Sequence, residues 1–249
     1  MNLYSKLCLT CLMLIGASAL AESPFVPLTD DLIPAGTDYH LVQPAVTDPN
    51  QLAGKRVAIL ASHGVEETEI QFPYEYLKSR GAKVDILVPW WTAKGVVTSN
   101  YVKNTGFAKA QGTFRTGEKY DLIILTGGAW NGQVELGDAD LKALVYRHYV
   151  TEQKPLAAIC KGTEVLIHIK SRDGQGHEDV DGPSIIRGMK VAGPDYEKEN
   201  LKNAGFLYQD NTKAVVSGRL LTGVDPTGLV EFVSRIPSLL DGKCGSSLM

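Results

Sequence analysis

Short, continuously apolar runs alternate with amphipathic stretches along most of this chain, and this alternation limits the possible folds more than any other feature. Runs of about four to eight apolar residues are typical of buried strands, whereas a period near 3.6 indicates helices. Strands are predicted at 55–61, 84–89, 121–126, 156–160 and 189–192. Helices are predicted at 66–80, 136–150, 163–169, 195–204 and 226–240, with a hairpin formed by 213–217 and 219–222.

Strands that are apolar throughout are buried on both faces, which is the pattern of parallel sheets. Parallel strands need crossover connections, and helices between them cover both faces of the sheet. The sequence therefore predicts an α/β fold, a doubly wound and mostly parallel sheet with helices on both faces. Ligands of such sheets bind beyond the carboxyl ends of the strands.

The first residues have the pattern of a cleavable signal peptide. Lys6 precedes the apolar run 7–15, and Ala19 and Ala21 have the spacing that a signal peptidase recognises. We expect 1–21 to be removed, 22–51 to be an extended arm, 52–240 to be the folded domain and 241–249 to be a tail. A periplasmic or secreted protein without a membrane anchor follows from this interpretation. The alternative is that the apolar run is the first helix of the core.

The charge distribution argues against a nucleic-acid partner. The formal net charge is -3 and the chain has no dense cluster of Lys and Arg, so it lacks the basic surface that phosphate backbones require. A small-molecule substrate or an oxidant is the expected partner.

Removal of the signal peptide would take Cys8 and Cys11 and leave Cys160 and Cys244 as the cysteines of the mature chain. In an oxidising compartment these two could form a disulfide, which would occupy Cys160. A free thiol is the other possibility.

The segment 157–162 has the layout of a nucleophile elbow, in which an apolar strand runs into a cysteine, a tight turn and a helix. Such a turn places backbone N–H groups and a helix N-terminus beside the Cys160 sulfur, and both lower the pKa of a thiol. A small buried apolar residue at a strand end is the alternative for Cys160.

Two other predicted strands also end in polar groups, at the same carboxyl-end edge of the sheet as Cys160. Glu66 and Glu69 follow the first strand and share one face of the next helix. Glu69 is a candidate to hydrogen-bond the sulfur or to move a proton. Gly127 and Gly128 end the middle strand, where their backbone N–H groups could bind an oxyanion.

The motifs GVEETEIQFPYEYLKSRGAKVDILVP, DLIILTGGAWN and KPLAAICKG, in this order, resemble the ThiJ/PfpI family over roughly 55–240. The resemblance implies a flavodoxin-like sheet, usually in a homodimer, with a reactive Cys160 whose sulfur contacts Glu69. It also implies an oxyanion-binding backbone at Gly128 and Lys161. Members are described as glyoxalases, deglycases, chaperones, peptidases, hydratases and oxidation sensors, so the resemblance leaves the reaction open.

The chain departs from family peptidases and amidotransferase-like relatives at two positions. Lys161 stands where many have a histidine after the cysteine, and Gly193 stands where others have a later histidine. Peptidase activity is therefore not expected. His63, at the end of the first strand, is the candidate to replace the missing base, and Trp130 is a candidate wall of the pocket. The spacing of His and Cys predicts no metal site, and we expect no cofactor.

Two functions remain open at this point. The first is an exported thiol enzyme of glyoxalase or hydrolase type acting on a small electrophilic carbonyl, with Cys160, Glu69 and His63 as catalytic residues. The second is a redox sensor or protective protein in which Glu69 stabilises oxidised Cys160. A disulfide between Cys160 and Cys244 would leave only a structural or binding role.

Overall fold

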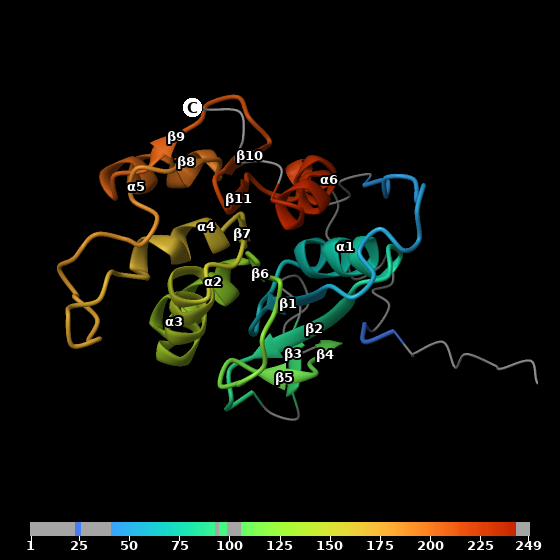
Figure 1. Cartoon of the computed structure of the whole chain (residues 1–249), viewed down its shortest axis with the longest axis horizontal. Coiled ribbons are helices and arrows are strands. Elements are labelled where there is room, and N and C mark those ends of the chain that lie inside the picture. Colours follow the sequence, from blue (N-terminus) through green and yellow to red (C-terminus); the bar gives the residue numbers. More distant parts are fainter. Residues whose placement is uncertain (1–22, 26–40, 93–94, 99–105, 243–249) are drawn as a thin grey trace, which may run out of the picture.

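A seven-stranded sheet runs through the centre of the domain in the computed structural model, which describes residues 23–25, 41–92, 95–98 and 106–242 (Figure 1). In spatial order its strands are β10 (Ala214–Ser217), β11 (Leu220–Gly223), β7 (Leu156–Ile159), β6 (Leu122–Leu125), β1 (Arg56–Leu60), β2 (Lys83–Val88) and β5 (Gly112–Thr113). All neighbouring pairs are parallel except β10 with β11. The predicted doubly wound, mostly parallel α/β sheet is confirmed.

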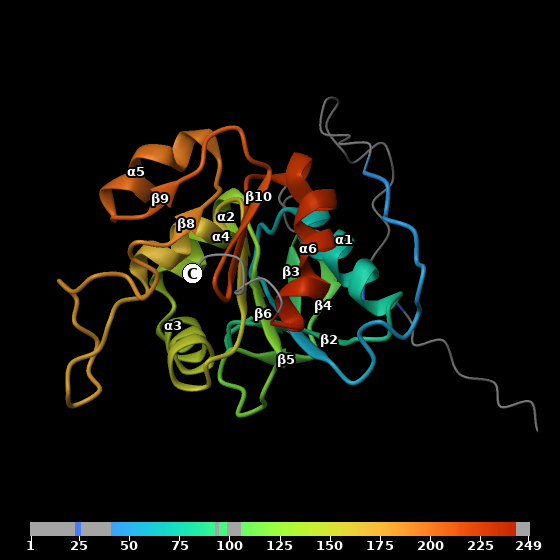
Figure 2. The same ribbon diagram turned by 45° about the horizontal axis from the view of Figure 1, so that its top comes forward.

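Helices cover both faces of this sheet, as Figure 2 shows. Helices α1 (Glu67–Lys78) and α6 (Leu229–Leu240) pack on one face, whereas α3 (Ala139–Tyr146), α4 (Gly162–Val165) and α5 (Lys198–Asn203) pack on the other. In β1, Val57 and Ile59 join the first core cluster, and Ala58 and Leu60 join the second. Burial on both faces explains why β6 and β7 are apolar at every position and why β1 is apolar after Arg56.

The predicted helix 136–150 is confirmed over most of its length but starts too early. It corresponds to α3 and to the π-helical turn η3 (Arg147–Thr151) that follows, whereas residues 136–137 belong to a separate helix, α2 (Ala129–Gly137). Asp138 separates α2 from α3, because its extended backbone ends the first helix and its side chain accepts a hydrogen bond of 2.9 Å from the Leu141 N–H. The helix that carries Trp130 was therefore missed.

Smaller differences concern short elements. The predicted helices 163–169, 195–204 and 226–240 each contain a 3₁₀ turn, namely η4 (Leu166–His168), η5 (Asp195–Glu197) and η6 (Pro226–Gly228). Strand β8 (Lys190–Val191) pairs with β9 (Leu207–Tyr208) outside the main sheet. The antiparallel pair β3 (Val96–Thr98) and β4 (Gly106–Lys109) was not predicted.

The signal peptide, Cys244, the tail from 243 and residues 26–40 of the arm lie outside the described residues. Within the described part of the arm, Pro44 and Ala45 accept hydrogen bonds of 2.9 Å from Arg80, just after α1. In the portion of the chain that the structure describes, no helix is both long and apolar enough to cross a bilayer.

Candidate functional site

Cys160 occupies a strained turn between β7 and α4. Its φ angle is 53°, a left-handed conformation that residues other than glycine rarely adopt and that is often found at functional sites. The Cys160 N–H donates to the Gly223 carbonyl at 3.1 Å, which ties the turn to β11. At Gly162 an added Cβ would lie 2.6 Å from the Leu125 carbonyl oxygen, so the turn passes too close to β6 for a side chain. Within the described residues, Cys160 is a free cysteine.

Glu69 reaches the same turn from α1. Its side chain is fully buried, and its Oε2 accepts a hydrogen bond of 2.6 Å from the Gly127 N–H. An added Cβ at Gly127 would lie 2.5 Å from Glu69 Oε2, 2.7 Å from Cys160 Cβ and 2.9 Å from the Lys161 nitrogen. The ends of β6 and β7 and the start of α1 therefore meet at one point, and only a glycine fits between them.

Replacement of Gly127 by alanine is expected to destabilise the fold by about 1–3 kcal/mol, the usual cost of overpacking. The added methyl group would have to displace Glu69 or the Cys160 turn. The measurement is the free energy of unfolding in urea. Gly137→Ala at the end of α2 is the matched control, because no atom lies within 4 Å of its added Cβ. Equal stabilities of the two variants would contradict the tight contact.

Burial controls the protonation of this pair. Desolvation, and secondarily the nearby Glu66 carboxylate, raise the pKa of Glu69 well above its ordinary value. Desolvation and the Glu69 charge likewise raise the pKa of the Cys160 thiol, against opposing hydrogen bonds from Tyr196 and the Lys161 N–H. Glu69 Oε1 has no partner with full hydrogen-bond geometry, although its contact with Cys160 lowers the pKa of the carboxyl. Both the Glu69 carboxyl and the Cys160 thiol are therefore favoured in their protonated forms, and a thiolate forms only when the thiol proton is transferred to another group.

A cavity of about 450 Å³ opens onto this pair. Its lining residues come from five segments: Glu66, Glu69, Gly128, Ala129, Cys160, Lys161, Tyr196, Asp225 and Pro226. Gly128 and Lys161 precede α2 and α4, and N–H groups at a helix start have no partner within the helix. Both residues therefore border the cavity at a helix start, and the Lys161 N–H donates to the Cys160 sulfur.

Tyr196 and Asp225 were missed in the sequence. The Tyr196 hydroxyl lies 3.6 Å from the Cys160 sulfur, and Asp225 follows β11, the neighbour of β7. The predicted hairpin showed where β11 ends, so Asp225 had a usable signal. Tyr196 had none, because its position depends on the β8–β9 pair that folds back outside the main sheet.

The Lys161 side chain is held by carboxylates. Its Nζ lies 2.5 Å from Glu197 Oε1 and 2.9 Å from Glu164 Oε2. Burial alone would lower the pKa of Lys161, but these hydrogen bonds outweigh it and the pKa is raised. The Lys161 side chain therefore stays cationic and is not available as a base.

The other candidates lie outside the cavity wall. The His63 ring stands 6.1 Å from the Trp91 ring, and neither His63 nor Gly127 is among the described lining residues. Trp130 is 69% exposed and packs against the backbone of Gly64, where an added Cβ would lie 2.5 Å from Trp130 Cβ. In the described ranges, no cluster of His, Cys, Asp or Glu could hold a metal ion.

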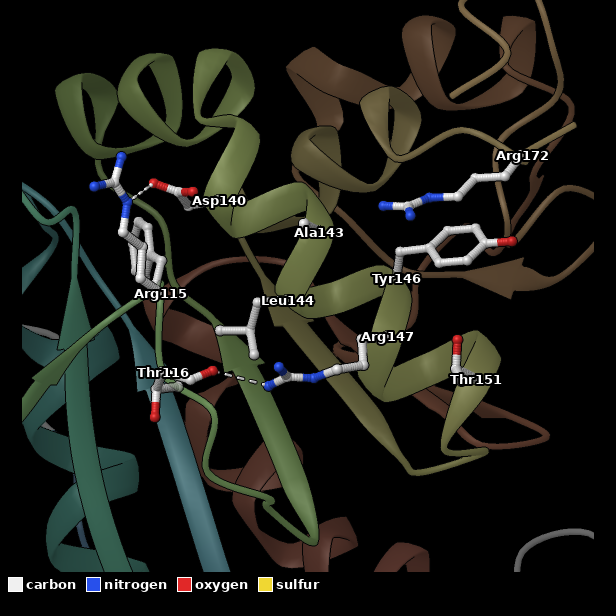
Figure 3. A pocket seen from close by; sticks show the side chains of 10 residues that line it. Arg115, Thr116, Asp140, Ala143, Leu144, Tyr146, Arg147, Thr151 and Arg172 are labelled. Carbon is white, nitrogen blue, oxygen red and sulfur yellow. Dashed lines mark hydrogen bonds and ion pairs between the residues drawn. The ribbon is translucent and has the colours of Figure 1, made fainter. Parts of the chain in front are cut away.

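A separate hollow of about 490 Å³ lies along α3 and η3, and Figure 3 shows Arg115 paired with Asp140 and Arg147 reaching the Thr116 carbonyl there. It shares no lining residue with the cavity that contains Cys160. The hollow along α3 and η3 is therefore separate from the cavity onto which Cys160 opens.

Glu135 is a second buried carboxyl behind this edge. Within the described residues neither of its oxygens has a partner with full hydrogen-bond geometry. Burial raises the pKa of Glu135 well above the ordinary 4.5, and the contact with Asn131 lowers it only in part. Because the folded state binds the Glu135 proton more tightly than the unfolded state does, protonated Glu135 contributes to the stability of the fold at acid pH. This contribution is lost progressively as the pH rises above the ordinary pKa of 4.5.

Glu135→Gln is therefore expected to stabilise the protein increasingly from pH 5 to pH 8. A gain of about 1 kcal/mol would raise Tm by about 2–4 °C in a domain of this size. Thermal unfolding at both pH values is the measurement, with the exposed Glu199→Gln as control. A Tm difference that does not change with pH would contradict a buried neutral carboxyl.

Comparison with known proteins gives a consistent picture. A deglycase of Pyrococcus horikoshii is 26% identical over 188 residues, covering 74% of this chain and 99% of that protein. General stress protein 18 of Bacillus subtilis is 23% identical and covers 76% of this chain and 99% of its own length. The crystal structure of Drosophila melanogaster DJ-1beta matches with a TM-score of 0.62 at 21% identity, covering 76% of this chain and 91% of that one.

The family model described as the DJ-1/PfpI family matches residues 55–238. This range contains every strand of the main sheet and both members of the Cys160–Glu69 pair. With its fold and its sequence in agreement, the chain belongs to the DJ-1/PfpI family.

Proposed function

We propose that this protein is an exported, cysteine-dependent enzyme of glyoxalase or hydrolase type that acts on a small electrophilic carbonyl. The observation that carries the proposal is the single cavity in which the Cys160 thiol, the buried Glu69 carboxyl and the strand-end N–H groups of Gly128 and Lys161 meet. Nucleophile, proton carrier and oxyanion donors are the parts that covalent catalysis at a carbonyl requires.

In a glyoxalase-type reaction on a 2-oxoaldehyde, the Cys160 sulfur bonds to the aldehyde carbon and the thiol proton passes to the aldehyde oxygen, giving a hemithioacetal. In the molecules in which Glu69 is ionised, its carboxylate then removes the hydrogen from that carbon and delivers it to the adjacent carbon. The hydroxyl proton on the first carbon moves to the oxygen of the adjacent carbon, which leaves a 2-hydroxy thioester. Water cleaves the thioester, releases a 2-hydroxy acid and returns the proton to the sulfur. The raised pKa of Glu69 makes its carboxylate a stronger base than an ordinary glutamate.

We assign the proton transfers to Glu69 rather than to His63, because Glu69 lines the cavity and His63 does not. Turnover is tested with methylglyoxal and with a p-nitrophenyl ester, without added metal or cofactor. Product formation on either substrate supports the proposal, and no turnover across a range of such carbonyls contradicts it.

A second candidate function is oxidative protection without turnover. It is favoured by the buried Glu69 carboxyl, which as a neutral acid can hydrogen-bond an oxidised sulfur, and by the similarity to a general stress protein. Two equivalents of peroxide would convert the thiol to a sulfinic acid and release two waters. Intact-mass measurement after mild peroxide decides: two oxygen atoms added at Cys160 support this role, and an inert thiol rejects it.

We further propose export with cleavage after Ala21 and assembly as a homodimer. The signal-peptide pattern supports the first, and the family resemblance supports the second. N-terminal sequencing of the processed protein and light scattering test them. An uncleaved chain or a monomer at micromolar concentration would contradict the respective proposal.

A further inference from the structure

A second cavity adjoins the reaction cavity, and we propose that it binds the body of a larger substrate whose reactive carbonyl lies at Cys160. This annex cavity has a volume of about 530 Å³ and shares Tyr196 and Asp225 with the reaction cavity. Its lining residues are Gly193, Pro194, Asp195, Tyr196, Tyr208, Gln209, Asn211, Thr212, Lys213, Val224 and Asp225. The inference rests on the proposed function, because it assigns a substrate class to the same thiol.

The combined size of the cavities argues for a substrate larger than a three-carbon carbonyl. Pockets of about 300–1,000 Å³ hold drug-sized ligands, and each of the two cavities reaches that range alone. Since Tyr196 contacts the Cys160 sulfur and also lines the annex, a chain attached to the reacting carbonyl can pass over its ring from one cavity to the other.

Hydrogen bonds hold the annex wall in place. The Tyr208 hydroxyl lies 2.7 Å from the Gly193 carbonyl and 3.2 Å from Asp195 Oδ1. Lys213 Nζ donates to Thr227 Oγ1 at 2.6 Å, and Asp225 Oδ1 accepts from the Thr227 N–H at 2.8 Å. The wall is therefore joined to β9, to η5 and to the start of η6, as a preformed binding site requires.

The lining chemistry identifies the class of ligand. Two carboxylates, Asp195 and Asp225, stand against the single ammonium of Lys213, so an anionic body would be repelled. Carboxylates accept hydrogen bonds from hydroxyl groups, and an amide both donates and accepts. The Asn211 side chain makes no hydrogen bond within the described residues and is exposed at the annex. These features fit a 2-oxoaldehyde carried on a neutral, hydroxylated chain.

The test compares methylglyoxal with 3-deoxyglucosone, which have the same 2-oxoaldehyde group but differ in the hydroxylated chain. Asn211 has a φ of 55°, which glycine adopts freely, so Asn211→Gly removes the amide without backbone strain. It is expected to lower kcat/KM for 3-deoxyglucosone about threefold to tenfold, the effect of one hydrogen bond, and to leave methylglyoxal turnover unchanged. Thr212→Phe, which fills the annex, should show the same selectivity, and Asn50→Gly in a distant turn is the matched control.

If Asn211→Gly changed kcat/KM for the two substrates equally, or for neither of them, the proposal that the annex binds the substrate chain would be wrong. If the wild-type protein turns over neither compound, the proposed function fails, and calorimetry then tests the annex separately. Binding of 3-deoxyglucosone to Cys160→Ala that weakens on adding Asn211→Gly would support the annex. Binding that does not change would reject it.

Discussion

Cys160→Ser is expected to lower kcat/KM for methylglyoxal by about 10³-fold or more, the scale at which loss of a nucleophile acts in covalent catalysis. The serine hydroxyl has nearly the same volume, so the cavity and the Gly127 contact persist. It is a much weaker nucleophile, however, because a hydroxyl group ionises far less readily than a thiol. Lactate formation under identical conditions is the measurement.

The stability of Cys160→Ser is the control for this prediction. Cys160 is buried and has a φ of 53°, and serine adds no atom to this position. Unfolding free energies of the two proteins within about 1 kcal/mol of each other would therefore show that the fold is intact. Turnover retained within tenfold of wild type would mean that another group attacks the carbonyl.

Glu69→Gln is expected to have two opposite effects. Turnover should fall by about 10³-fold, because a positioned acid or base contributes about 10²–10⁴ and Gln cannot transfer the proton. The Cys160 thiol should become more reactive, because the Glu69 charge is a cause of its raised pKa. Alkylation by iodoacetamide should therefore be faster in the variant than in the wild type at any pH at which Glu69 of the wild type carries its charge.

The pH dependence gives the sign of this effect. In the wild type, the pKa of Glu69 is raised above its ordinary value, and once Glu69 is charged it opposes ionisation of the Cys160 thiol. The rate of alkylation therefore continues to rise toward alkaline pH. In Glu69→Gln the rise should occur at lower pH. Glu75→Gln, exposed on the same helix, is the matched control and should alter neither quantity. Parallel loss of turnover and of alkylation would indicate collapse of the site rather than loss of proton transfer.

The sequence predicted the sheet because β6 and β7 are apolar at every position and β1 is apolar after Arg56, a pattern that burial on both faces requires. It also brought Glu69, Gly128 and Cys160 to one edge, since parallel strands present their carboxyl ends together. The structure adds the close contact at Gly127, which no spacing rule contains because it depends on how α1 tilts against the sheet.

Periodicity failed where local capping or tertiary pairing decides the structure. Asp138 caps α3 through one side-chain hydrogen bond and separates it from α2, which the sequence pattern did not predict. Tyr196 enters the site because the short β8–β9 pair and η5 carry it back over Cys160. Residues of this kind are placed by contacts distant in sequence, so a single sequence offers little signal for them.

The measurement that tests the central claim most directly is the number of product molecules formed per Cys160 thiol. The mature protein is mixed with a large excess of methylglyoxal, lactate is counted, and the intact mass of the protein is determined afterwards. The account predicts many lactate molecules per protein with the Cys160 mass unchanged. One equivalent or less, with a permanent adduct or added oxygen on Cys160, would contradict it.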